Sequence, residues 1–144
     1  MSCRGLLLLA HGSKDPEWLT SLKMIEDFAR REFAGPTVLC YLESATPRVE
    51  QGVLELVYAG VRHIAVAPLF LAAGSHVKVD IPNLIRAERD RHPGVDFLIL
   101  PTIGQLPQVQ RAISIAIVRS ASPHRIPDTD VLIASLQGPF QSPG

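Results

Sequence analysis

The sequence predicts an α/β fold: a four-stranded parallel sheet in the order 2-1-3-4, with helices on both faces. Four short and nearly continuous apolar runs, at 5–10, 37–42, 63–68 and 96–100, are typical of strands covered on both faces. Amphipathic stretches of helical length follow each of them. Strands that alternate with helices pair in parallel through right-handed crossovers.

The first two helices have recognisable starts. Asp15 is a favoured N-cap and Pro16 suits a first helical turn. The buried stripe expected for this helix is Trp18, Leu22, Ile25 and Ala29. Thr46 and Pro47 predict the start of the second helix in the same way, and Gly60 predicts its end. Its expected buried face is Val49, Val53 and Leu56.

The last two helices are expected at 77–91 and 106–119. Pro82 lies inside the third helix, so we expect either a kink near its start or a start delayed to Asp80. The inward residues expected in the fourth helix are Val109, Ile113 and Ala116.

A length of 144 residues suits one domain, which we place at 1–120. The C-terminal tail, 121–144, is rich in Pro and Ser. It has a possible edge strand at 131–136 and an end that we expect to be disordered.

Composition excludes several classes of partner. Fourteen basic residues balance fourteen acidic ones, so the chain lacks the positive charge that nucleic-acid binding requires. The two cysteines form no disulfide framework or C-x-x-C pair. The apolar run at 6–10 is too short for a signal peptide or a membrane span. We therefore expect a cytoplasmic protein with reduced thiols and no membrane partner.

Three potential metal ligands follow three successive strands. His11 comes after the first predicted strand, Glu43 after the second, and His76 after the third. Because parallel strands present their carboxyl ends at one edge of the sheet, these side chains should gather there. Each residue alone could be an ordinary loop residue, but two imidazoles and a carboxylate together suit a first-row divalent metal ion. Such a set does not choose among iron, cobalt, nickel and zinc. His63, at the opposite edge, is expected to be structural.

Four segments resemble the small sirohydrochlorin chelatases, the cobaltochelatase and ferrochelatase family. They are LLLAHGS at 7–13, YLESATP at 41–47, PLFLAAGSHVKVDIP at 68–82 and, more weakly, LPTIGQLP at 100–107. The chain departs from the family pattern at Ser75, where a glycine is frequent, and at Gln105, where a histidine is common. No part of the tail has a counterpart.

The resemblance implies a flavodoxin-like chelatase fold and a lyase that inserts a divalent metal into sirohydrochlorin, a polycarboxylate tetrapyrrole. Co²⁺ is the first expectation, with Fe²⁺ or Ni²⁺ as alternatives, in cobalamin or sirohaem biosynthesis. It further implies a homodimer, and no cofactor beyond the metal substrate. The metal ligands would be His11, Glu43 and His76, and the two histidines would also relay protons.

Substrate carboxylates need donors near these ligands. The backbone N–H groups of Gly12 and Ser13 precede a helix and can meet an anion. Lys14, Arg48 and Lys78 lie close in sequence to the ligands and are expected as carboxylate partners.

Other functional classes fit less well. A metal or tetrapyrrole carrier without turnover would keep the same ligands and stays open as an alternative. Histidine phosphatases need an arginine before their His-Gly pair, and Ala10 stands there. The G-x-S-x-G motif of α/β-hydrolases does not occur.

Overall fold

A computed structural model describes residues 3–122 of the chain. The chain forms two compact units, Met1–Ile103 and Gly104–Gly144. The sheet and all three predicted metal ligands belong to the first unit. The domain boundary predicted at residue 120 stays a prediction, and the possible edge strand at 131–136 lies outside the described residues. No helix in the described part of the chain combines the length and apolar character needed to cross a membrane.

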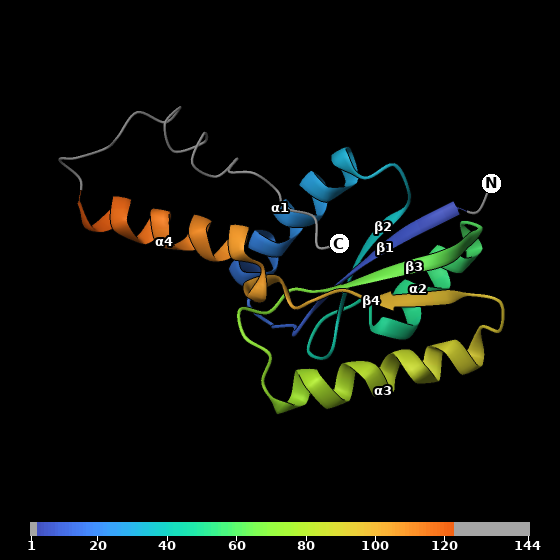
Figure 1. The fold of residues 1–144 in the computed structure, drawn as a ribbon. Coiled ribbons are helices and arrows are strands. Elements are labelled where there is room, and N and C mark those ends of the chain that lie inside the picture. Colours follow the sequence, from blue (N-terminus) through green and yellow to red (C-terminus); the bar gives the residue numbers. More distant parts are fainter. Residues whose placement is uncertain (1–2, 123–144) are drawn as a thin grey trace, which may run out of the picture. The chain divides into compact units, whose positions relative to one another are not determined.

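The sheet has the predicted topology. Its strands are β1 (Cys3–Ala10), β2 (Thr37–Tyr41), β3 (Val61–Pro68) and β4 (Asp96–Ile99). They lie in the order β2-β1-β3-β4, and every neighbouring pair is parallel (Figure 1). All five residues of β2 and the last four residues of β1 are buried, as expected for strands that lie between layers of side chains.

Helices cover both faces of this sheet. On one face, α2 (Val49–Tyr58) and α3 (Ser75–Arg91) pack over a core that includes Leu7 and Leu9 of β1. On the other face, α1 (Pro16–Glu32) covers Leu8 and Ala10 of the same strand. Alternate residues of β1 therefore serve opposite layers, which is the two-residue period of a strand.

Helix α1 starts as predicted, but one position of its buried stripe differs. The Asp15 Oδ1 atom accepts a hydrogen bond from the Glu17 N–H at 2.9 Å, which makes Asp15 the N-cap. Ile25 is 47% exposed, whereas the neighbouring Glu26 is buried. The Glu26 carboxylate accepts the Leu39 N–H of β2 at 3.1 Å, and this bond holds a charged residue against the sheet.

Two other helix starts differ from the expectation. Helix α2 begins at Val49 with Arg48 as its N-cap, not at Thr46, because the Gln51 side chain accepts the Arg48 N–H at 2.8 Å. Helix α3 begins at Ser75 and continues through Pro82. The delayed start at Asp80 is therefore wrong.

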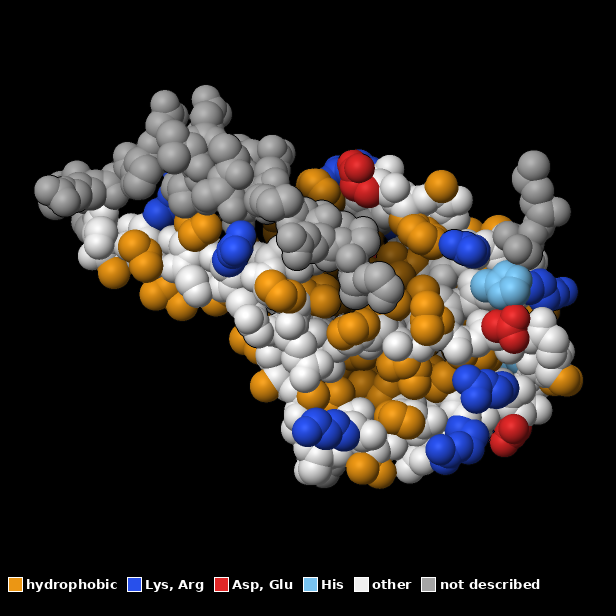
Figure 2. Space-filling view, in the orientation of Figure 1, with side chains coloured by type: hydrophobic (Ala, Val, Ile, Leu, Met, Phe, Trp, Pro, Cys, Tyr) orange, Lys and Arg blue, Asp and Glu red, His pale blue; other side chains and the backbone are white. Residues whose placement is uncertain are grey.

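Part of the α1-side face of β3 and β4 carries no covering helix from the first unit. Phe97 of β4 packs against the core under α2 and α3, so the next residue, Leu98, lies on the α1-side face, where it is 63% exposed. Figure 2 shows a hydrophobic area in the middle of the face in view, with charged side chains around its margins and most of them at the right.

The described part of the second unit is helical. A short 3₁₀ turn at Ile103–Gln105 leads into α4 (Pro107–Ala121), and the Gln110 side chain donates to the Gly104 carbonyl at 3.0 Å. Within this unit Val109 is half-buried, whereas Ile113 and Ala116 are exposed, and the inward face expected at these three residues stays a prediction.

Candidate metal centre

The backbone brings two of the predicted ligands together. Ala10 and Tyr41 are paired in the last register position of β1 and β2. Hydrogen bonding continues past the strand ends, since the Leu42 N–H donates to the Ala10 carbonyl and the Glu43 N–H donates to the His11 carbonyl, both at 2.9 Å. His11 and Glu43 are therefore held side by side by an extension of the sheet.

Gly12 permits this close approach. Its φ is +106°, a conformation that side chains disfavour. A Cβ atom at this position would lie 1.6 Å from the Glu43 carbonyl oxygen. Only glycine allows the two segments to touch here.

The His11 and Glu43 side chains contact each other at the solvent-exposed surface. His11 Nε2 lies 3.0 Å from Glu43 Oε1, and the side chains are 60% and 58% exposed. An imidazole nitrogen and a carboxylate oxygen that converge in solvent can both turn toward an arriving cation. Nitrogen and oxygen ligands of these types suit first-row divalent metals.

The pair lies at a cavity of about 720 Å³. The residues that line the cavity come from the first two strand ends, the segment after β3 and one face of α3: His11, Leu42, Glu43, Phe70, Val77, Asp80, Asn83, Leu84 and Ala87. Most of its wall is apolar, with four polar side chains among these residues. The walls therefore suit a largely apolar ligand that also carries polar groups.

Asp80 and Asn83 were not foreseen as residues of this cavity. Val77, Asp80, Leu84 and Ala87 follow the spacing of one helix face, so the sequence does contain a signal: a carboxylate within an apolar stripe. The signal can be used only once the helix is known to begin before Asp80.

The third predicted ligand is placed by its backbone. His76 is the second residue of α3, which follows β3 at the same edge of the sheet as His11 and Glu43. The His76 side chain is not among those that the structure describes, so its role as a metal ligand stays a prediction. Among the described side chains, no three histidine, cysteine, aspartate or glutamate residues form a metal-binding group.

None of the expected anion partners is among the residues that line this cavity. The Ser13 hydroxyl accepts the Asp15 N–H at 3.0 Å, which places it in the cap of α1. Lys14, Arg48 and Lys78 are all exposed, and none of them lines the cavity beside His11. Their role toward substrate carboxylates stays a prediction.

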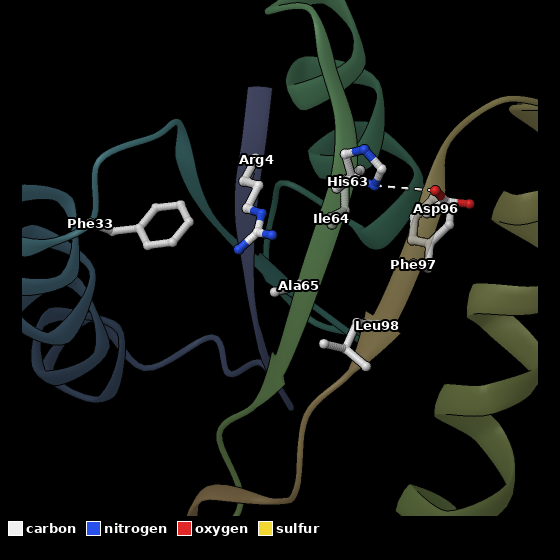
Figure 3. A pocket seen from close by; sticks show the side chains of 9 residues that line it. Arg4, Phe33, His63, Ile64, Ala65, Asp96, Phe97 and Leu98 are labelled. Carbon is white, nitrogen blue, oxygen red and sulfur yellow. Dashed lines mark ion pairs between the residues drawn. The ribbon is translucent and has the colours of Figure 1, made fainter. Parts of the chain in front are cut away.

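A second cavity, of about 380 Å³, lies at the opposite end of the strands (Figure 3). There His63 Nδ1 of β3 lies 3.1 Å from Asp96 Oδ2 of β4, with Arg4 of β1 in the same row of the sheet. Phe33 reaches toward this row from the connection after α1. His63 thus pairs with a carboxylate far from His11 and makes a useful control for it.

Comparison with known proteins identifies the family. A family model described as CbiX matches residues 5–120, which is most of the chain. The chain belongs to the CbiX family. The matched segment contains His11, Glu43 and the whole of α3.

Two curated relatives of the chain carry enzyme names. The sirohydrochlorin cobaltochelatase of Methanothermobacter thermautotrophicus is 36% identical over 81 residues, covering 56% of this chain and 57% of that protein. The sirohydrochlorin ferrochelatase of Priestia megaterium is 32% identical over 94 residues, covering 65% of this chain and 35% of that protein. The chain therefore spans less than two thirds of each of these relatives.

Solved structures agree with the CbiX assignment. A CbiX protein from Marinobacter aquaeolei VT8 superimposes with a TM-score of 0.75 at 29% identity, covering 83% of this chain and 96% of that one. SirB from Bacillus subtilis, solved with Fe³⁺, gives a TM-score of 0.74 at 25% identity, covering 86% of this chain and 48% of that one. The fold is thus shared with one protein of similar size and with about half of a longer one.

Proposed function

We propose that this protein is a sirohydrochlorin chelatase, a cytoplasmic lyase that inserts a divalent metal ion into the tetrapyrrole during cobalamin or sirohaem biosynthesis. Co²⁺ is the metal proposed first, with Fe²⁺ and Ni²⁺ as alternatives, and no cofactor beyond the metal substrate is proposed. The observation that carries the proposal is the His11–Glu43 contact of 3.0 Å beside a largely apolar cavity. The names of the two curated relatives support it.

The reaction exchanges two protons for one metal ion. The metal enters the ring as M²⁺, two pyrrole N–H groups each lose a proton, and the product is the metallated ring plus two H⁺. His11 and Glu43 are proposed to hold the ion, with His76 at the start of α3 as the third ligand. A ligand that releases the metal is free to accept a proton, so His11 and His76 are also the proposed proton acceptors.

An open site suits this task. A stable structural metal site surrounds its ion with protein ligands, whereas an ion to be handed on needs exchangeable positions. The exposed His11 and Glu43 side chains leave such positions for water or for a pyrrole nitrogen. The backbone N–H groups of Gly12 and Ser13, with Lys14, Arg48 and Lys78, are proposed to meet the substrate carboxylates.

A homodimer is part of the proposal. The chain matches 35% of the Priestia ferrochelatase and 48% of Bacillus SirB, so it corresponds to part of each longer chain. Two copies would supply the mass of one such protein. Sedimentation equilibrium at micromolar concentration should give a mass near twice 15.7 kDa, and a monomer would remove this part of the proposal.

The deciding experiment is an anaerobic insertion assay. Purified protein is mixed with sirohydrochlorin and separately with Co²⁺, Fe²⁺ or Ni²⁺, and the visible spectrum is followed against a blank without protein. We expect multiple turnovers that fall at least tenfold in His11→Ala and in Glu43→Gln.

His63→Ala is the matched control, because His63 also contacts a carboxylate but at the opposite end of the sheet. It should keep the wild-type rate. One equivalent of bound metal or tetrapyrrole without turnover would instead indicate a carrier, and equal rates in all variants would refute the site.

A further inference from the structure

One polar side chain on the wall of the cavity beside His11 has a fixed orientation. Arg86 Nη1 donates a hydrogen bond to Asn83 Oδ1 at 2.9 Å, between neighbouring turns of α3. A guanidinium has donors only, so the Asn83 amide has to turn its oxygen toward Arg86, and its NH₂ group faces away from that arginine. The bond uses the acceptor of the amide and leaves its two N–H donors for other partners.

These N–H groups give the cavity wall a donor for an anion. Among the described residues that line the cavity there is no lysine or arginine. Arg86 itself does not line it, but the Arg86 bond polarises the Asn83 amide, which does. Hydrogen bonds linked in this way strengthen one another. A carboxylate against this wall would therefore meet amide donors with a positive charge behind them.

The position of Asn83 along α3 fits the layout of a tetrapyrrole. Asn83 follows His76 by two helical turns, so the two backbone positions share a face of α3 and stand about 10 Å apart along its axis. His76 is a proposed ligand of the ion that enters the centre of the ring, whereas the substrate carboxylates lie at the rim. Val77 and Leu84 line the same cavity and offer apolar surface to the ring. A ring centred near the start of α3 would bring a rim carboxylate to the level of Asn83.

We propose that Asn83 is a specificity-determining residue for the tetrapyrrole: its amide N–H groups donate to a carboxylate at the rim of the ring, and Arg86 is the positioning residue that holds the amide in the donating orientation. This inference rests on the proposed function, since it takes sirohydrochlorin as the ligand of the cavity. An ordinary pair of neighbouring side chains on a helix surface would show the same Arg86–Asn83 bond. Only the proposed role connects that bond to tetrapyrrole binding.

Asn83→Asp separates these two explanations. Aspartate keeps and strengthens the contact with Arg86, but it replaces both N–H donors by acceptor oxygens. Asn83→Leu removes the polar group at similar size, and Arg86→Met removes the cation behind the amide. Arg89→Met is the matched control, because it removes a cation from an exposed position of α3 outside the cavity wall and outside the bond to Asn83.

Each variant is titrated with metal-free sirohydrochlorin, and kcat and the KM values for sirohydrochlorin and Co²⁺ are measured separately. We expect Asn83→Leu to raise the Kd and the KM for sirohydrochlorin about five- to twentyfold. Asn83→Asp should raise both further, because its carboxylate repels that of the substrate. Arg86→Met should raise them about two- to fivefold, and Arg89→Met less than twofold. In Asn83→Leu, kcat and the KM for Co²⁺ should change less than twofold.

Two results would overturn the proposal. One is an Asn83→Asp protein that binds sirohydrochlorin as tightly as the wild type, which is what a purely structural pair predicts. The other is an equal effect of Asn83→Leu and Arg89→Met on the Kd for sirohydrochlorin. Asn83 and Arg86 are both exposed, so we expect every variant to fold, and thermal unfolding by circular dichroism checks this.

The direct titration distinguishes failure of this inference from failure of the proposed function. If the wild type inserts metal but the Asn83 variants bind sirohydrochlorin as it does, only the role of Asn83 is refuted. If the wild type binds sirohydrochlorin without turnover, the chelatase proposal fails and the Kd values still test Asn83. If the wild type binds no sirohydrochlorin, both proposals are refuted.

Discussion

Replacing Gly12 by alanine should separate the two proposed ligands. The new Cβ would lie 1.6 Å from the Glu43 carbonyl oxygen, so that oxygen would have to move by about 1.5 Å or more to reach an ordinary contact distance. A shift of this size breaks the hydrogen bond from the Glu43 N–H to the His11 carbonyl. It also pulls the carboxylate away from the imidazole.

The expected cost has two parts. Alanine at a φ of +106° is strained by about 1–2 kcal/mol, and the lost hydrogen bond with its displaced loop adds about 1–2 kcal/mol. At roughly 4 °C per kcal/mol for a chain of this size, Tm should fall by about 8–16 °C.

Gly60 provides the matched control. It also has a positive φ, +83°, but a Cβ there would meet no atom within 4 Å. Gly60→Ala should therefore show the backbone strain alone, about 1–2 kcal/mol or roughly 4–8 °C. It should bind Co²⁺ as the wild type does.

The assay is thermal unfolding by circular dichroism together with Co²⁺ titration of each variant. Gly12→Ala should lose at least tenfold in Co²⁺ affinity under conditions where it is folded. A Gly12→Ala protein that melts no lower than Gly60→Ala, or that keeps wild-type affinity, would refute the proposed link between backbone contact and metal site.

Two further predictions concern titratable groups away from the site. Burial alone would raise the pKa of Glu26, but hydrogen bonds from Lys23 and the Leu39 N–H, with the charge of Arg30, hold that pKa below its usual value. Because the folded-state pKa is the lower one, this stabilisation is present above the unfolded-state pKa of about 4.3 and is lost as pH falls through the folded-state value. Glu26→Gln should thus cost about 1–2 kcal/mol in urea unfolding at pH 7 and less at pH 3, and an equal cost at both pH values would contradict the assignment. Burial raises the pKa of the Cys40 thiol to about 12. A thiol reagent at pH 8 should therefore label the partly exposed Cys3 and spare Cys40 until urea unfolds the chain, and rapid labelling of both in the native state would count against a closed core.

The sheet was predictable because its strands are read from composition alone. A short run rich in leucine and valine identifies a buried strand without any information about which strands lie beside it. The alternation of such strands with helices then predicts parallel pairing. Asp15 was equally clear, since its cap bond is made two residues away. Thr46 failed as a cap because Gln51 instead accepts the Arg48 N–H, a choice between two nearby candidates that local pattern does not decide.

The candidate site was predictable in part for the same reason. His11 and Glu43 follow neighbouring strands, so the rule that parallel strands end at one edge is enough to bring them together. The position of Asp80 at the cavity could not be foreseen, because the residues that share a helix face with it depend on where the helix begins. Pro82 made it uncertain from the sequence whether α3 begins before Asp80. Ile25 shows the same limit: which residue of α1 faces the sheet was decided by the bond from Leu39 to Glu26, a contact between distant parts of the chain.

The hydrogen bonds that continue from β1 and β2 into the ligand-bearing segments have a consequence for hydrogen exchange. The Glu43 amide is bonded to the His11 carbonyl although the Glu43 side chain is open to solvent. Its exchange should therefore be slowed with the ends of the strands and not occur at loop rates. The proposed ligands His11 and Glu43 would then keep their backbone spacing throughout the proposed insertion reaction, because the backbone at this edge is part of the sheet.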